Sequence, residues 1–164
     1  MPLRGWVTDR THDVFAKAHA LAQRLGHDEV TPVHVTISIL DEGTNVAALI
    51  LLHSCRVPRD SVVRDLEAQL PASGNPLAAE HLAWSPSDEA MLARAAEEAR
   101  ELGHQHHGCE HLLLAFLRDP TVGPGVILAR YGVDFARVQQ DLVRIFDGSM
   151  LWQAGESDIS GPAA

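Results

Sequence analysis

The chain contains an internal repeat, and this repeat constrains the fold more than any other feature of the sequence. The segment Arg24-Leu25-Gly26-His27 aligns with Glu101-Leu102-Gly103-His104, 77 residues later, and the spacing becomes 76 after a one-residue shift. Because two copies of one unit are expected to share one structure, each copy helps to interpret the other. Further identical pairs are Ala16 and Ala93, Ala18 and Ala95, Ala22 and Ala99, His34 and His111, Leu40 and Leu117, Val57 and Val133, and Val62 and Val138.

The first helix of each copy is predicted from an apolar stripe with helical spacing. Ser85-Pro86 is typical of a helix start, and the glycines Gly26 and Gly103 are typical of helix ends. The stripe consists of Phe15, Ala18, Ala22 and Leu25 in the first copy and Leu92, Ala95, Ala99 and Leu102 in the second.

The second helix of the first copy is the least obvious element. Residues 33–39 alternate apolar and polar side chains, a pattern that taken alone indicates a strand. The aligned residues 111–117 form a continuous apolar run that favours a helix, and Thr31-Pro32 is a strong helix start. We therefore predict a helix in both copies. A third helix is expected near 45–54 and 124–131, and a fourth near 58–70 and 134–146.

These elements predict an all-α fold in which two four-helix repeats pack as one domain. We expect the domain to span residues 7–147, with repeat one at 7–70, a linker at 71–83 and repeat two at 84–147. Residues 148–164 are rich in Gly, Ser and Ala and are expected to be a flexible tail. Within it, Met150-Leu151-Trp152 either fold back on the domain or form a short docking segment.

Composition narrows the classes of function. The chain has 22 acidic and 13 basic residues, and its net charge of −9 argues against nucleic-acid binding. No run of 18 apolar residues is present to cross a membrane, and no secretory signal is apparent, so we expect a cytoplasmic protein with reduced cysteines. A phosphate-binding Gly-x-x-x-x-Gly-Lys-[Ser/Thr] motif is also absent, which excludes an ATPase of that class.

The second copy carries the most specific sequence pattern. Leu102-Gly103-His104 is followed by Gly108-Cys109-Glu110-His111-Leu112-Leu113-Leu114, and Tyr131-Gly132-Val133-Asp134 precedes the fourth helix. Set in a double four-helix repeat, these residues resemble the Clp ATPase N-terminal domain, in a stand-alone form without the AAA+ ATPase modules. The similarity runs from about Val7 to Gly148. It implies a non-catalytic protein-binding module that receives substrates or adaptors for a Clp unfoldase or protease.

The resemblance also implies a ligand site at Glu110. In some members of the family, a glutamate of a Gly-Thr-Glu-His segment engages phosphorylated arginine, and Glu110 matches that glutamate. The aligned residue of the first copy is Val33, which cannot ionise, and Cys109 and Pro32 replace the usual threonines. We therefore expect at most one phosphoarginine site. The alternative interpretation is that Glu110 is an acid in the first turn of a helix, where it interacts with the helix dipole.

Three other functions are open at this level. A free copy of such a domain could act as a decoy for cyclic-peptide antibiotics, because these compounds target N-domains of the family. The segment His104 to His111 contains imidazole, thiol and carboxylate groups that bind zinc. However, His104 and His111 align with His27 and His34, which favours a structural role, and we expect no metal and no cofactor. Cys109 with His107 or His111 could form a nucleophile, but no third orienting residue is evident, so we do not expect an enzyme.

Overall fold

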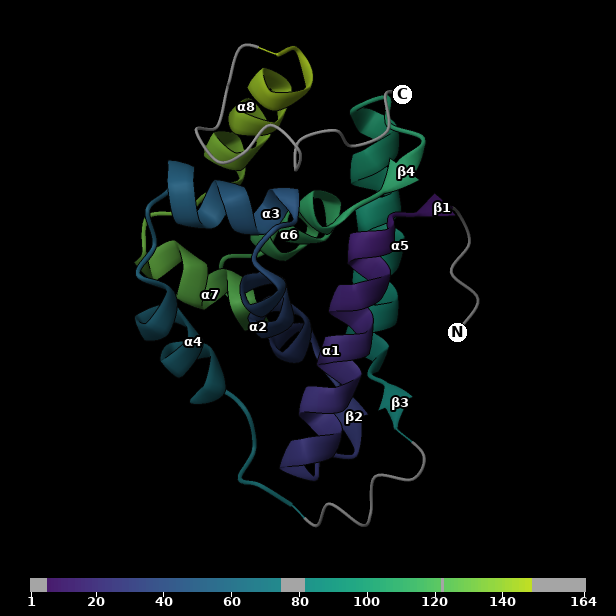
Figure 1. The fold of residues 1–164 in the computed structure, drawn as a ribbon, viewed down its shortest axis with the longest axis vertical. Helices are drawn as coiled ribbons and strands as arrows, with labels where there is room; N and C mark the ends of the chain where they lie inside the picture. The colour runs from purple at the N-terminus through teal and green to yellow at the C-terminus, as the bar shows by residue number, and fades with distance from the viewer. Residues whose placement is uncertain (1–5, 75–81, 122, 149–164) are drawn as a thin grey trace.

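The computed structural model describes residues 6–74, 82–121 and 123–148, and it shows two successive groups of helices (Figure 1). The predicted tail, including Met150-Leu151-Trp152, and residues 75–81 of the predicted linker lie outside the described residues. The first group contains β1 (Trp6–Val7), α1 (Asp9–Leu25), β2 (Glu29–Val30), α2 (Pro32–Glu42), α3 (Val46–Leu49), the π-helical turn η1 (Ile50–Ser54) and α4 (Arg59–Glu67). The second contains β3 (Ala83–Trp84), α5 (Pro86–Glu101), β4 (His106–His107), α6 (Cys109–Leu117), α7 (Gly123–Arg130) and α8 (Phe135–Phe146).

The predicted all-α fold with four helices in each repeat is confirmed, with α3 and η1 together forming the third helix of the first repeat. Ser85 caps α5 through a bond from the Asp88 N–H, at 3.1 Å. Gly26 and Gly103 adopt left-handed backbone conformations at the ends of the two first helices, as their predicted role requires. The four two-residue strands were not predicted, because segments this short show no periodicity.

The alternating pattern of α2 has a simple explanation in the structure. All residues from Val33 to Leu40 are buried, so the polar members of the alternation do not face solvent. Thr36 instead donates from its hydroxyl to the carbonyl of Pro32, at 2.9 Å. A helix that is buried on all sides shows no polar face, and its sequence period therefore carries little information.

The core is built around α2 and α6, the second helices of the two repeats. Their largest fully buried apolar side chains are Ile39, Leu40, Leu112, Leu113 and Leu114. Among the described residues, no single helix has both the length and the apolar character needed to cross a membrane; only the bent pair Pro32–Glu42 and Val46–Ser54, at 77°, meets those criteria jointly.

Two short parallel strand pairs join the repeats in a reciprocal way. The strand that precedes the first helix of each repeat pairs with the strand that precedes the second helix of the other. Thus β1 pairs with β4, with Trp6 opposite His106, and β2 pairs with β3, with Glu29 opposite Ala83. Under the repeat alignment Trp6 corresponds to Ala83 and Glu29 to His106, so the two pairs are equivalent.

A hydrogen-bonded pair of histidines fastens the start of the second helix in each repeat. In the first repeat, the Thr31 N–H donates to Nδ1 of His34 at 3.0 Å, which leaves the ring proton on Nε2. That proton is donated to Nδ1 of His27 at 2.9 Å, and Nε2 of His27 in turn donates to the Pro71 carbonyl at 3.2 Å. The histidines therefore satisfy both main-chain and side-chain polar groups inside the fold.

The second repeat contains the equivalent hydrogen bonds at the helix start and between the two histidines. The Gly108 N–H donates to Nδ1 of His111 at 2.9 Å, and Nε2 of His111 donates to Nδ1 of His104 at 2.8 Å. The four histidines that the repeat alignment brings into register are therefore hydrogen-bonding elements of the helix junctions.

The histidine pairs predict a pH-dependent contribution to stability. Burial first, and then the neighbouring His27, lower the pKa of His34 to about 4, whereas an unfolded histidine titrates near 6.5. Between these values the unfolded chain binds more protons, so the stabilisation is present above pH 6.5 and is lost as the pH falls toward 4. We expect His34→Gln to lower the free energy of unfolding by about 2 kcal/mol at pH 7, and by clearly less at pH 5.

Urea unfolding of the wild type and the variant at both pH values measures this difference. His12→Gln, on the exposed face of α1, serves as the control and should match the wild type at both. If His34→Gln lowers the free energy of unfolding equally at pH 7 and pH 5, the lowered pKa assigned to His34 is contradicted.

A second prediction concerns Arg56, which has a φ of 53° and is the only described non-glycine residue with a positive φ. The repeat alignment places Gly132, with a φ of 76°, at the equivalent position. A side chain in this conformation is strained by about 1 kcal/mol, and the Arg56 side chain is exposed. We expect Arg56→Gly to raise the free energy of unfolding by about 1 kcal/mol and Gly132→Ala to lower it by a similar amount. Urea unfolding at neutral pH tests both, and a destabilised Arg56→Gly variant would overturn the explanation.

Candidate functional site

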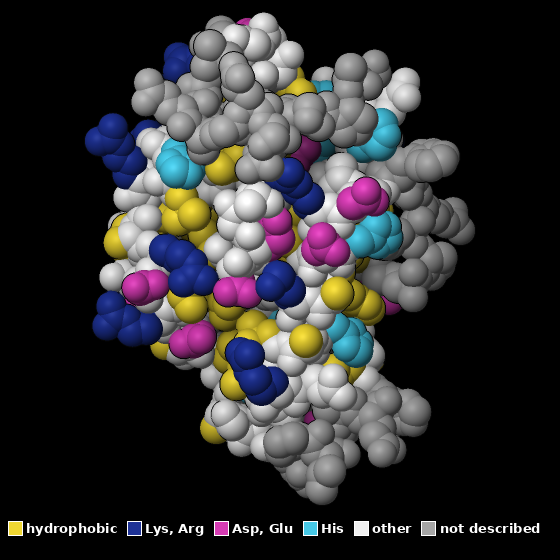
Figure 2. All heavy atoms as spheres, in the orientation of Figure 1, with side chains coloured by type: hydrophobic (Ala, Val, Ile, Leu, Met, Phe, Trp, Pro, Cys, Tyr) yellow, Lys and Arg dark blue, Asp and Glu magenta, His cyan; other side chains and the backbone are white. Residues whose placement is uncertain are grey.

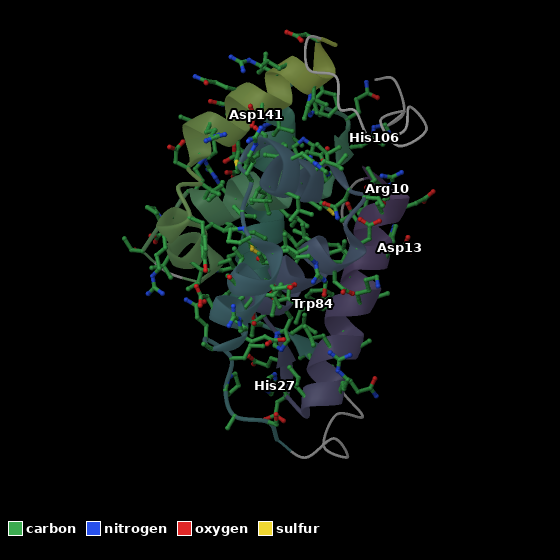
Figure 3. All side chains as sticks on the ribbon, turned by 60° about the vertical axis from the view of Figure 1, so that its left-hand side comes forward. Arg10, Asp13, His27, Trp84, His106 and Asp141 are labelled. Atoms are coloured by element: carbon green, nitrogen blue, oxygen red, sulfur yellow. The ribbon has the colours of Figure 1, made fainter. Side chains whose placement is uncertain are left out.

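A groove of about 420 Å³ lies between α1 and α5, next to the β1–β4 pair. Helix α1 contributes Thr11 and Phe15, and α6 contributes Leu112 at the base. Figure 3 shows His106 of β4 near the end of α1 that carries Arg10, and Trp84 beside a later part of that helix. Helix α5 supplies one face of the groove, which consists of Glu89, Leu92, Ala93, Ala95, Ala96, Glu97 and Arg100.

The groove has an apolar interior and charged groups at its rim. Glu97 is already neutralised by Arg94, whose Nη1 lies 2.7 Å from the Glu97 carboxylate. Glu89 and Arg100 are both exposed, and neither forms an ion pair within the described ranges. Acidic and basic side chains are interspersed over the face seen in Figure 2 rather than gathered by sign.

Glu110, the site residue that the sequence predicted, lies in the first turn of α6 and is only 8% exposed. Its carboxylate folds back over Gly108, so closely that a Cβ on Gly108 would lie 2.2 Å from Oε2 of Glu110. Only glycine at position 108 leaves room for this arrangement. Gly108 lines the groove whereas Glu110 does not, so the carboxyl group lies behind the groove wall.

The Glu110 carboxyl titrates close to neutral pH. Burial raises its pKa to about 7, against the opposing effect of a bond from its own backbone N–H. Nδ1 of His111 lies 3.6 Å from Oε1, but this nitrogen accepts the Gly108 N–H and carries no proton. Burial lowers the pKa of His111 to about 3, so the contact is not an ion pair at neutral pH. An ionised Glu110 would therefore be an acceptor for an incoming cation such as a guanidinium group.

Cys109, the candidate nucleophile, is 1% exposed, and its sulfur lies 3.4 Å from the Thr11 hydroxyl. Burial raises the pKa of this thiol, and it raises that of Cys55 as well. Because the thiolate is the reactive form, these environments hold both sulfurs in their unreactive state.

The histidines that suggested a zinc site form other interactions. His104 and His111 hydrogen-bond each other, and β4 holds His106 opposite Trp6. Within residues 6–74, 82–121 and 123–148, no group of three or more His, Cys, Asp or Glu side chains is arranged to hold a metal ion.

Sequence reasoning missed the groove itself. Its lining comes from β1, α1, α5, β4 and α6, which are distant in the sequence, and most lining residues also fit an ordinary helix surface. The sequence did contain one signal of the groove. At two aligned positions the repeats differ in side-chain size, because Val7 and Leu92 are smaller than Trp84 and Phe15.

Comparison with known proteins agrees with this architecture. The model of the Clp repeat (R) N-terminal domain family matches residues 7–131 and 83–148. The chaperone protein ClpB of Oceanobacillus iheyensis is 29% identical over 157 residues, which covers 96% of this chain and 19% of the relative. The chloroplastic chaperone protein ClpC2 of Oryza sativa subsp. japonica is 31% identical over 144 residues, with 84% and 15% covered. The chain thus spans less than a fifth of the length of these relatives.

Solved structures show the same fold. The N-terminal domain of the ClpV1 ATPase from E. coli superimposes with a TM-score of 0.67 at 22% identity, covering 84% of this chain and 83% of that one. The Hsp104 N-terminal domain from Candida albicans gives a TM-score of 0.69 at 16% identity, with 93% and 99% covered. With the family model matching nearly all of the described residues, this chain belongs to the Clp repeat (R) N-terminal domain family.

Proposed function

We propose that this chain is a non-catalytic protein-binding module of a Clp chaperone or protease system, and that it receives substrate or adaptor segments in the groove between α1 and α5. The observation that carries the proposal is the groove, which offers an apolar interior of about 420 Å³ on a Clp N-terminal domain fold. Apolar concave surfaces with a few charged groups at the rim suit polypeptide segments that carry exposed apolar side chains.

The environments of the cysteine and histidine candidates fit the proposed binding role. Cys109 is buried and its pKa is raised, and Nε2 of His111 is hydrogen-bonded to His104. Cys55 and Cys109 are both free thiols, which fits a proposed site of action in the cytoplasm.

The repeat supplies a matched pair of variants to test the groove. Ala93 and Ala16 are aligned, exposed and on equivalent helices, but only Ala93 lines the groove. We expect Ala93→Arg to weaken binding of fluorescein-labelled, reduced and carboxymethylated α-lactalbumin at least about tenfold, since a long charged side chain would occupy the apolar space. Ala16→Arg should bind like the wild type.

Fluorescence anisotropy titration measures these affinities, and circular dichroism checks that both variants are folded. A wild-type protein that does not bind this unfolded probe would overturn the proposed function. Equal binding by Ala93→Arg and Ala16→Arg would remove the groove as its site.

Glu110 supports a second candidate, a single phosphoarginine pocket in repeat two. The observation that favours it is a buried carboxyl group, next to the groove, that has no cationic partner among the described residues. The aligned Val33 is apolar and buried, so the first repeat offers no equivalent acceptor. A guanidinium group would bind the ionised form of Glu110 through charge-assisted hydrogen bonds.

This candidate predicts binding that strengthens as the pH rises. With a pKa of about 7, roughly a tenth of the Glu110 carboxyls are ionised at pH 6 and roughly nine tenths at pH 8. We therefore expect the affinity for free phosphoarginine to be up to about tenfold higher at pH 8 than at pH 6. Glu110→Gln should bind more weakly and lose this pH dependence. Calorimetric titrations at both pH values provide the measurement, and no heat of binding in the wild type at pH 8 would retire the phosphoarginine site.

A further inference from the structure

Because the two strand pairs are equivalent under the repeat, the place of the groove has a counterpart in the other half of the molecule. The groove lies next to β1 and β4, and the repeat alignment relates these strands to β3 and β2. Val7 of β1 corresponds to Trp84 of β3, and Phe15 of α1 corresponds to Leu92 of α5. The two positions can therefore be compared residue by residue on nearly the same backbone.

The equivalent position is filled by the chain itself. There the indole of Trp84 packs edge-on against the ring of Phe15, with 5.2 Å between ring centroids and 77° between ring planes. The corresponding residues on the groove side are Val7 and Leu92, and both line the open space. An isopropyl and an isobutyl group thus stand where the other half has an indole and a phenyl group. We attribute the open space beside Val7 and Leu92 to this smaller side-chain volume.

We propose that the groove receives an aromatic side chain of the bound polypeptide, in the position equivalent to that of Trp84. This inference rests on the proposed function and names the kind of residue that anchors the partner. The ring of the partner contacts Phe15, which also lines the groove, and it is surrounded by Val7, Leu92 and Leu112. Edge-on contacts of this kind add to the free energy of apolar burial, which favours an aromatic over an aliphatic anchor.

The charged residues at the rim of the groove indicate which residues lie on either side of the aromatic anchor in the bound segment. Glu89 and Arg100 lie near opposite ends of the α5 face and are exposed, without ion pairs to described residues, whereas Glu97 is held by Arg94. Arg100 lies eleven positions after Glu89 along the helix, which corresponds to a rise of about 16 Å. About five residues of extended chain cover that length. The complementary segment therefore has a central aromatic residue, a basic residue toward Glu89 and an acidic residue toward Arg100.

The first experiment varies the central residue of a probe peptide. Pentapeptides blocked at both ends, with Lys at one end, Glu at the other and Trp, Leu or Ala in the centre, are titrated in both sequence directions into the ¹⁵N-labelled protein. We expect amide shifts near Val7, Leu92 and Ala96, at least about tenfold weaker binding for Ala than for Trp, and intermediate binding for Leu. Equal affinities for the three centres, or no binding of the Trp peptides, would overturn the aromatic anchor.

Two variants of the protein test the same contact from the groove side. Val7→Trp reproduces the residue found at the equivalent position, so it should fill the groove and weaken the Trp peptide at least about tenfold. Ala16→Trp adds the same side chain outside the groove and should leave the affinity unchanged. If Val7→Trp does not fold, the peptide series on the wild type still decides the question.

The charge assignment is tested by reversal. The sequence direction of the Trp peptide that binds better to the wild type should bind worse to the double variant Glu89→Arg/Arg100→Glu. An unchanged preference would remove the rim charges from the proposal. One combination of results separates the two proposals. If the unfolded α-lactalbumin probe binds, Ala93→Arg weakens that binding, and the three peptides bind with equal affinity, the proposed function stands and the aromatic anchor fails.

Discussion

The reciprocal pairing of two-residue strands is the constraint on which the rest of this structure depends. Each repeat pairs its leading strand with the other repeat, β1 with β4 and β3 with β2. Main-chain hydrogen bonds make few demands on side chains, so the same pairing accepts Trp6 opposite His106 and Glu29 opposite Ala83. Strands this short are not stable alone. They act by fixing the ends of α1 and α5, and the groove lies between those helices beside β1 and β4.

The two repeats share a backbone but have diverged in their side chains, and the candidate site lies where they differ. Trp84 fills one position between the repeats, while Val7 leaves the equivalent one open. Glu110 places a carboxyl group where the first repeat has Val33. A duplicated fold can tolerate such changes in one copy because the other copy, together with the shared core of α2 and α6, maintains the architecture.

His111 and Glu110 show how burial separates the pKa values of two neighbouring groups, because it disfavours the charged form of each. Burial, and then the neighbouring His104 and His107, lower the pKa of His111 to about 3, so it stays neutral and its Nδ1 accepts the Gly108 N–H. Glu110, the residue before His111 in α6, accepts its own N–H, and burial raises its pKa to about 7. At neutral pH the imidazole is therefore an uncharged part of the helix junction, whereas the Glu110 carboxyl is partly ionised.

The sequence by itself determined the helices and their duplication. The aligned second repeat identified α2 as a helix although residues 33–39 alternate like a strand, and Gly26 and Gly103 marked the ends of the first helices. It also placed Glu110 in the first turn of α6. These features depend on local backbone preferences and on repetition, which can be compared along the chain. Only the tertiary structure decided where the repeats meet, that Glu110 lies behind Gly108, and that a groove is open beside Val7. A groove forms where side chains from distant segments do not fill the space between them. No local sequence pattern indicates this combined side-chain volume.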